Sequence, residues 1–238
     1  CRIRSLVFLV FALWAFGVVV ELVEGSSSTF RFLNLDLMPL RVDRLSLAFA
    51  YVFILIAFLG GIYGYHLKET GQQVAALVYA GSSLGVLFAG DFFTLFVYWE
   101  IMAVASVCLI FARCTDPSRE AGFRYLIVHL FGGSALLAGI LWQYAGTGSI
   151  LFNQSEGGPG AYLILLGFAI NAAIPPLHAW LSDSYPEATV TGSVFLSAFT
   201  TKTAVYVLAR GFAGWEILTV AGTVMALYGG VFAFLEND

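Results

Sequence analysis

The 238-residue sequence is 60% hydrophobic and 11% charged, whereas soluble globular domains carry about 45–50% apolar and about 25% charged residues. This composition excludes a soluble domain, and it excludes an intrinsically disordered chain, which needs low hydrophobicity and high charge. Eleven Lys and Arg against fifteen Asp and Glu provide no basic surface for nucleic acid. The three cysteines, Cys1, Cys108 and Cys114, form no CxxC pair, so we expect no disulfide framework, no metal site and no cofactor. Cys108 lies in an apolar run and is predicted to be a small core residue.

Eight apolar runs approach the ~20 residues that a membrane-spanning helix needs. In chain order they cover residues 5–23, 45–65, 74–89, 92–111, 123–144, 162–181, 191–209 and 217–234. The third run is short and could merge with the Gly90-Asp91 turn that precedes the fourth, where Asp91 is predicted to be a helix N-cap. The sequence therefore predicts an all-α polytopic membrane protein with about eight transmembrane helices.

The first apolar run has an alternative interpretation as a signal peptide, because Arg2 and Arg4 precede it. No small-residue cleavage site follows, and residues 20–24 read Val-Glu-Leu-Val-Glu. These observations favour a membrane span.

The segment between the first two spans, residues 26–44, alternates apolar and polar side chains, as in Phe30-Arg31-Phe32 and Leu35-Asp36-Leu37. Such alternation is typical of short strands. Because Pro39 interrupts the alternation, we predict a small hairpin near residues 28–42 at the membrane surface.

Basic residues set the orientation of membrane spans, since they favour the cytoplasmic side. A cytoplasmic N-terminus places Arg2, Arg4, Lys68, Arg113, Arg119 and Arg124 inside and Arg31, Arg41, Arg44 and Arg210 outside. Six against four is a weak preference for this orientation.

Three ionisable side chains lie deep within predicted spans: Glu100, His129 and Lys202. An ionisable group at mid-membrane costs roughly 2.5–3.5 kcal/mol on insertion scales, so such residues are candidates for function. A carboxylate, an imidazole and an amine can each change charge when their surroundings shift the pKa towards neutrality, which fits a proton relay. Two structural alternatives stay open: Glu100 and Lys202 could form a static ion pair, and His129 could donate a hydrogen bond between helices.

Two adjacent prolines, Pro175 and Pro176, lie in the middle of the sixth run, shortly after Asn171 and before His178. A helix interior cannot keep its hydrogen bonds there. Broken helices at membrane depth line cavities and mark transporter sites. The alternative is a simple proline kink. In a broken helix, His178 would reach freed carbonyl groups or water.

Three stretches carry a resemblance to a known family: GDFFTLFVYWE at 90–100, PPLHAWLSDSYP at 175–186 and LSAFTTKTAVYVLAR at 196–210. They resemble the fifth helix, the broken seventh helix and the eighth helix of antiporter-like subunits. These subunits occur in Mrp-type cation/proton antiporters, respiratory complex I and membrane-bound hydrogenases. The likeness covers almost the whole chain and is nearest to the Mrp-type D subunit.

The resemblance implies about fourteen helices with two inverted five-helix repeats, of which this chain would hold the second to the ninth helix. Residues 1–73 would be N-terminal helices with the surface hairpin, residues 74–210 the first repeat, and residues 211–238 the start of a truncated second repeat. Glu100 matches the family's fifth-helix glutamate and Lys202 its eighth-helix lysine. Asn171 replaces the usual seventh-helix lysine, seven residues before His178, so either Lys202 partners Glu100 instead or proton handling is altered. Ser182 replaces a common proline.

The resemblance implies a proton-translocating subunit of a multisubunit Na⁺/H⁺ antiporter in a bacterial or archaeal plasma membrane. Glu100, Lys202, His129 and His178 would transfer protons, while Asn171, Pro175 and Pro176 shape the site. Its partners would be other membrane subunits, the lipid bilayer, protons and Na⁺. One alternative is a redox-driven pumping subunit of a complex I-like oxidoreductase or hydrogenase, a translocase whose redox chemistry is done by its partners. The other is an inert membrane scaffold.

Overall fold

The computed structural model describes residues 2–235, with side chains from residue 4 onward. Cys1, the side chain of Arg2 and the outermost ends of the predicted segments 1–73 and 211–238 lie outside the described residues. The elements in chain order are α1 (Arg2–Glu21), β1 (Ser27–Phe32), β2 (Leu35–Arg41), α2 (Arg44–Tyr63), a short 3₁₀ turn η1 (Gly64–His66), α3 (Thr70–Phe88), α4 (Phe92–Phe111), α5 (Asp116–Thr147), α6 (Pro159–Asn171), α7 (Ala179–Ser184), α8 (Val190–Ala198), α9 (Thr200–Gly211) and α10 (Glu216–Leu235).

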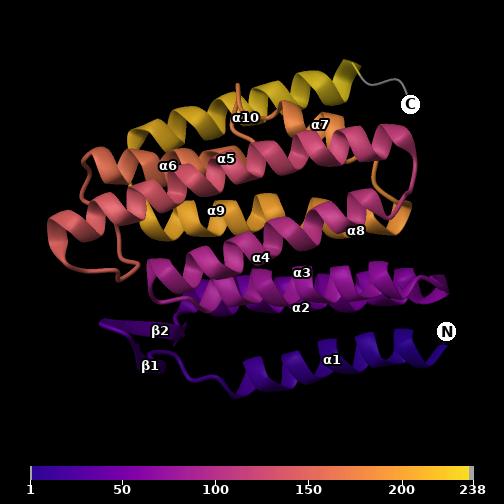
Figure 1. The fold of residues 1–238 in the computed structure, drawn as a ribbon, viewed down its shortest axis with the longest axis horizontal. Helices are drawn as coiled ribbons and strands as arrows, with labels where there is room; N and C mark the ends of the chain where they lie inside the picture. Colours follow the sequence, from indigo (N-terminus) through magenta and orange to yellow (C-terminus); the bar gives the residue numbers. More distant parts are fainter. Residues whose placement is uncertain (1, 236–238) are drawn as a thin grey trace.

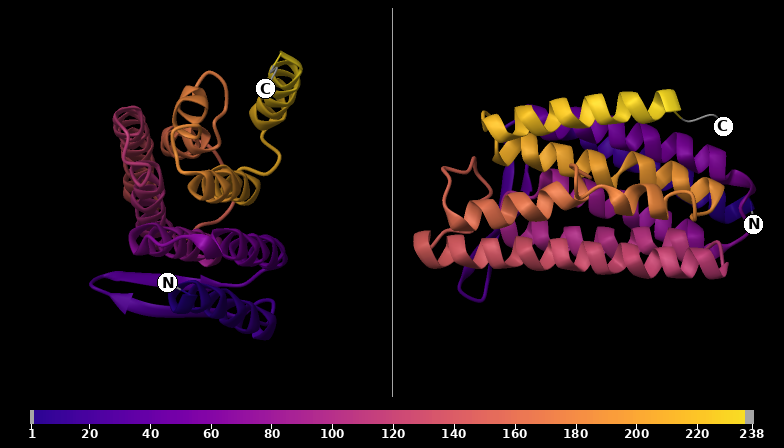
Figure 2. Two further views of the ribbon diagram at one scale, coloured as in Figure 1. Left: turned by 90° about the vertical axis from the view of Figure 1, so that its right-hand side faces the viewer. Right: turned by 90° about the horizontal axis from the view of Figure 1, so that it is seen from above.

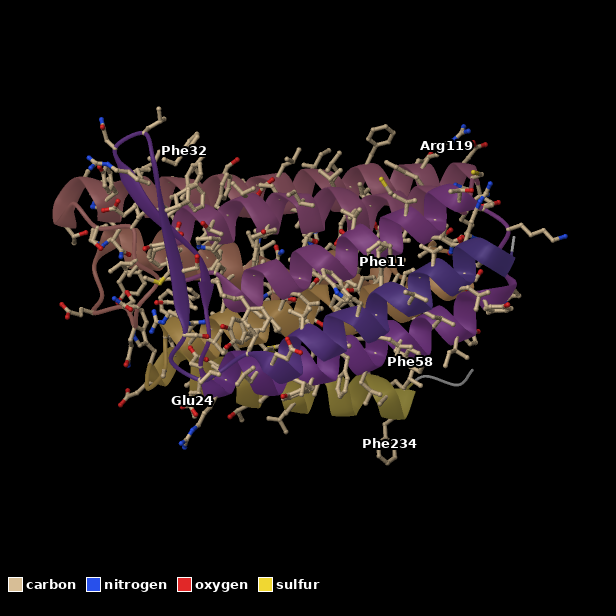
Figure 3. All side chains as sticks on the ribbon, turned by 90° about the horizontal axis from the view of Figure 1, so that it is seen from below. Phe11, Glu24, Phe32, Phe58, Arg119 and Phe234 are labelled. Carbon is tan, nitrogen blue, oxygen red and sulfur yellow. The ribbon has the colours of Figure 1, made fainter. Side chains whose placement is uncertain are left out.

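The long helices lie side by side along one axis, with the hairpin at one end of the bundle (Figure 1). Seen end-on, α1 and the hairpin lie on one side of the bundle, and α5 and α10 extend to the opposite side (Figure 2). Exposed apolar side chains such as Phe11 and Phe234 project along the helices, while Glu24 and Arg119 lie near opposite ends (Figure 3). This distribution is that of a bundle surrounded by hydrocarbon, with its charges at the two membrane surfaces.

Within the described residues, six helical segments are long and apolar enough to cross a membrane, if α8 and α9 are taken together as one (Val190–Gly211), and they confirm six of the eight predicted runs. The run 74–89 lies in α3, which is 19 residues long and separate from α4, so it does not merge with the turn at Gly90-Asp91. Polar residues such as Gln72, Gln73, Ser82 and Ser83 lower its hydropathy. The run 162–181 is divided between α6 and α7.

The predicted hairpin forms from β1 and β2, which pair antiparallel. Pro39 lies inside β2, at the point where the ladder of the hairpin shifts register. The strand tolerates this proline, which lacks an N–H, because the ladder shifts register there and the sheet has only edge strands. Asp91 anchors the hairpin: its carboxylate caps α4 through Thr94 N at 2.7 Å and accepts from Met38 N at 2.7 Å. The predicted N-cap is therefore confirmed, and it also fixes β2 against α4.

Glycines bring α5 and α6 into backbone contact. A Cβ atom built on Gly139 would lie 2.6 Å from the Gly160 carbonyl oxygen, and one built on Gly167 would lie 2.8 Å from the Gly132 carbonyl oxygen. Small residues at such positions allow close helix packing in membranes, where apolar burial supplies no driving force between helices. The two glycine pairs also set the antiparallel register of α5 and α6, which places the functional candidates described below.

Substitution of Gly139 by Leu is expected to destabilise the bundle by about 1–3 kcal/mol, because the side chain would force α5 and α6 apart. The matched control is Gly146→Leu on the same helix, where an added Cβ would meet nothing within 4 Å. Thermal denaturation in detergent compares the two variants. Equal melting temperatures would contradict the close packing of α5 on α6.

Candidate functional site

The prolines of the sixth run interrupt the helix, as predicted. α6 ends at Asn171 and α7 begins at Ala179. Between them the Pro175-Pro176 bond is cis and Ala173 has a positive φ of 55°. The alternative of a simple proline kink is wrong, because the helix stops and restarts. The indole Nε1 of Trp180 donates to the Ile170 carbonyl oxygen at 2.9 Å, which satisfies a group near the end of α6.

Charged and aromatic groups hold α7 in place beside the break. Asp183 accepts two hydrogen bonds from Arg124 of α5, at 2.8 and 2.9 Å. On the other side, His178 Nε2 shares a hydrogen bond of 2.7 Å with the Tyr228 hydroxyl of α10. A cavity of about 480 Å³ lies here, lined by Pro175, His178, Thr201 and Tyr228 among others. The predicted contact of His178 with freed carbonyls is not what the structure shows, since its Nε2 meets a hydroxyl.

Glu100 lies in the middle of α4, and its carboxylate packs against Gly133 of α5. A Cβ atom on Gly133 would collide with Oε1 of Glu100, so the carboxylate fills the space that a side chain would occupy. Glu100 Oε1 is buried and has no hydrogen-bond partner in the described part of the chain. The residue is half-buried and also lines a groove between α3 and α4. Glu100 is thus placed between the interior of the bundle and this groove.

The groove has a volume of about 840 Å³ and runs from Glu69 and Cys114 at one end of the bundle to Glu100 at mid-span. Its walls are mainly apolar, from Val74 and Val78 of α3 and Ile101 and Val104 of α4, among others. The end at Glu69 and Cys114 belongs to the surface where the loop residues Lys68 and Arg113 lie. Cys108 is exposed in the groove, so the prediction that it is a core residue is wrong.

His129 and Asn171 lie on the interior side of Glu100. His129 is one helical turn before Gly133 and therefore on the same face of α5. The antiparallel register set by the two glycine pairs places Asn171 of α6 opposite the turn of α5 that contains His129. A Cβ on Gly132 would lie 3.6 Å from Asn171 Oδ1. Both residues are almost fully buried. Glu100 thus lies against Gly133 and Asn171 beside Gly132, with His129 one turn earlier on α5.

The polar atoms of this group have few partners. His129 Nδ1 donates to the Tyr125 carbonyl at 2.9 Å in its own helix, and its ring stacks on Tyr125 with centroids 3.8 Å apart. The alternative in which His129 bonds between helices is therefore wrong. His129 Nε2 and both side-chain polar atoms of Asn171 are buried without a hydrogen-bond partner among the described residues. Unpaired buried polar groups are rare in folded proteins and each one requires an explanation.

Lys202 does not form an ion pair with Glu100 in the structure. None of the six ion pairs within residues 2–235 joins these two side chains, so the static pair, and with it the partnership of Lys202 with Glu100, is not observed. Instead Lys202 Nζ donates to the Ser197 carbonyl oxygen. This carbonyl lies beside a second helix interruption, at Phe199, where α8 gives way to α9. The sequence predicts one continuous run over 191–209, so this interruption was missed.

Three aromatic residues at the two interruptions were also missed: Tyr79, Trp180 and Tyr185. Trp180 bonds Ile170 at the first interruption. Tyr185 donates to the Leu196 carbonyl oxygen at 2.8 Å, and the Tyr79 hydroxyl accepts from Thr200 N at 2.9 Å, both at the second. A polar aromatic within an apolar run is a weak signal, since tyrosine and tryptophan are common in membrane proteins.

Residues 89–238 match the family described as "NADH:quinone oxidoreductase/Mrp antiporter, TM". The chain belongs to this family. The matched residues include Glu100, His129, the broken helix at Pro175-Pro176 and Lys202. Family membership confirms the resemblance and the expectation of a polytopic membrane protein.

Similar proteins of known name are longer than this chain. The A subunit of the Na(+)/H(+) antiporter of Alkalihalophilus pseudofirmus is 33% identical over 224 residues, which cover 83% of this chain and 28% of that protein. Hydrogenase-4 component B of Escherichia coli is 26% identical over 92% of this chain and 36% of its own length. A chain of respiratory complex I from Thermus thermophilus shares the fold, with a TM-score of 0.83 and 20% identity over 98% of this chain and 53% of that one. The chain spans about a third of the two curated relatives.

Cys108 provides a test of the groove. In isolated membranes of a Cys114→Ala background, Cys108 is expected to react with N-ethylmaleimide at least about tenfold faster than a cysteine placed at the buried neighbour Val107, which reacts only after local opening. The comparison is Cys108 against Val107→Cys combined with Cys108→Ala, with modification followed by mass spectrometry. Equal rates would contradict a groove that is open along α4.

Proposed function

We propose that this chain forms a proton-translocating unit of a multisubunit membrane complex, with Glu100 as its proton-accepting carboxylate. The observation that carries the proposal is the position of Glu100, half-buried at mid-span between the groove and the Gly132-Gly133 face of α5. A carboxylate at this depth costs free energy to place in the membrane, and ionisable residues within spans mark functional sites. The groove offers a route to Glu100 from one membrane surface, and His129 with Asn171 continues the polar path inward.

Unpaired buried atoms support the inward part of the path. Glu100 Oε1, His129 Nε2 and the Asn171 amide belong to three different helices, with Glu100 against Gly133, Asn171 beside Gly132 and His129 one turn earlier on α5. Leaving such groups dry costs roughly 2–7 kcal/mol each, whereas buried water satisfies them. A water-linked path between them would carry protons by exchange along hydrogen bonds. Asn171 cannot take a proton, but its amide can hold water beside the carboxylate.

Lys202 and His178 would act at a later stage of the path. Lys202 lies at the second interruption rather than beside Glu100, and His178 lines the cavity towards α10. Proton transfer therefore passes from Glu100 through the His129 and Asn171 region towards these groups. Pro175 and Pro176 shape this region by ending α6 immediately after Asn171.

The relatives favour two kinds of complex. The match to a component of an Na(+)/H(+) antiporter supports cation/proton exchange, the function that the resemblance implies. That relative is an A subunit, and the particular likeness to the Mrp-type D subunit stays a prediction. The match to hydrogenase-4 component B covers more of this chain and supports the second candidate, a redox-driven pump. In both cases the chain works with other membrane subunits, in a bacterial or archaeal plasma membrane.

Replacement of Glu100 by Gln is expected to lower proton flux at least about tenfold in the assembled complex, equivalent to ~1.4 kcal/mol on the transfer barrier. The amide keeps the shape but cannot exchange the proton. The control is Glu156→Gln, an exposed carboxylate in the loop before α6. Flux is followed with a pH-sensitive dye in inverted membrane vesicles, with assembly checked by native gel electrophoresis.

The driving force in the same vesicles separates the alternatives. Flux that starts with a sodium gradient supports the antiporter, whereas flux that requires electron transfer supports the redox pump. Intact flux in Glu100→Gln would refute the role of Glu100. Loss of assembly alone would favour the inert scaffold.

Asn171 tests the hydrated path separately. Asn171→Leu replaces a buried amide with an apolar group of similar shape, so the variant is expected to be about as stable as the parent. Proton flux is nevertheless expected to fall, because the site loses its means of holding water. Thermal denaturation checks the stability, and the vesicle assay checks the loss of proton flux. A variant that keeps normal flux would exclude Asn171 from the path.

A further inference from the structure

The interruption between α8 and α9 is built by tyrosines from outside that helix. In an uninterrupted α-helix, the Thr200 N–H would donate to the Leu196 carbonyl oxygen. Here the N–H donates to the Tyr79 hydroxyl at 2.9 Å, and the carbonyl accepts from the Tyr185 hydroxyl at 2.8 Å. Two side chains therefore replace the two halves of one backbone hydrogen bond. Phe199 lies within this turn, with φ −105° and ψ −61°.

The two tyrosines reach the interruption from different elements. Tyr79 comes from the middle of α3, is fully buried, and also bonds the Thr200 hydroxyl. Tyr185 follows α7 directly, and its ring contacts Trp180, with centroids 5.8 Å apart. Since Trp180 bonds the Ile170 carbonyl at the first interruption, one short segment makes contacts at both helix breaks.

Lys202 uses the turn that the tyrosines keep open. Its ammonium group donates to the Ser197 carbonyl oxygen, the group to which Thr201 N–H would donate in a regular helix. We infer that Tyr79 and Tyr185 are positioning residues for Lys202. By binding the Thr200 N–H and the Leu196 carbonyl, they prevent the backbone hydrogen bond between these two groups, and this leaves the Ser197 carbonyl free to accept from the Lys202 ammonium. This inference rests on the proposed function, in which Lys202 transfers protons.

A double-mutant cycle of the two hydroxyls tests the inference. Tyr79→Phe alone leaves the Thr200 N–H without its acceptor, and Tyr185→Phe alone leaves the Leu196 carbonyl without its donor, so each variant should melt at a lower temperature than the parent. In the double variant these two backbone groups can bond to each other. Its melting temperature should therefore be no lower than that of the less stable single variant, and the losses should not add.

Proton flux, unlike the melting temperature, should not recover in the double variant. In the double variant the turn becomes regular helix, and the Ser197 carbonyl accepts from the Thr201 N–H instead of from Lys202. Because the Lys202 ammonium loses this hydrogen bond, proton flux in the assembled complex should fall about tenfold, the factor of one ordinary hydrogen bond. Hydrogen–deuterium exchange of the segment containing Thr200 should slow as the turn becomes helical. The matched control is Tyr206→Phe, which removes another buried hydroxyl that donates to a backbone carbonyl, that of Leu87, away from the interruption.

The outcomes distinguish this inference from the proposed function. Recovered stability with low flux and slowed exchange supports it. Additive losses of stability would overturn it, because the two hydroxyls would then not divide one backbone bond. Normal flux in the double variant, with flux abolished by Lys202→Gln, would overturn the positioning role and leave the proposed function standing. Normal flux in Lys202→Gln would remove the part of the proposed function on which the inference rests, and the inference with it.

Discussion

The constraint on which this structure depends is that hydrocarbon offers no hydrogen bonds to the backbone. A helix that crosses the membrane must satisfy every N–H and C=O within protein, so a helix can be interrupted only where other groups replace its lost bonds. The described residues contain two such interruptions, and at each one side chains bind backbone groups that the interruption frees. Trp180 bonds Ile170 at the first, while Tyr79, Tyr185 and Lys202 serve the second. These contacts connect α3 and the segment around α7 to the two interruptions.

The same constraint bears on the region proposed above as the proton path. At the interruptions the freed backbone groups named above are paired, whereas around Gly132 and Gly133 three side chains keep unpaired polar atoms. The unpaired atoms of Glu100, His129 and Asn171 are therefore the basis for placing the proposed proton path here. Close packing of α5 on α6 brings Asn171 beside Gly132, and the missing side chain of Gly133 leaves room for the Glu100 carboxylate of α4. Packing and function therefore depend on the same short stretch of α5.

Local signals in the sequence predicted part of this arrangement. Glu100 stands out because a charge in an apolar run is costly, and the first interruption stands out because proline cannot continue a helix. The second interruption has no such mark, since Phe199 is an ordinary apolar residue. It is created by Tyr79 and Tyr185, which lie far away along the chain, and only the tertiary fold brings them to it. The separation of Lys202 from Glu100 was unpredictable for the same reason, because spacing along the chain does not fix which helix faces which.

Asn171 changes what the site requires of its surroundings. With a lysine at this position, an ammonium group beside Glu100 would stabilise the charged carboxylate directly. The neutral amide cannot, and Lys202 is held at Ser197 instead. Charge on Glu100 must therefore be compensated by groups that approach through the groove or by protons that arrive with it. In the proposed function that route is the groove, because it opens between α3 and α4, on the side of Glu100 away from α5.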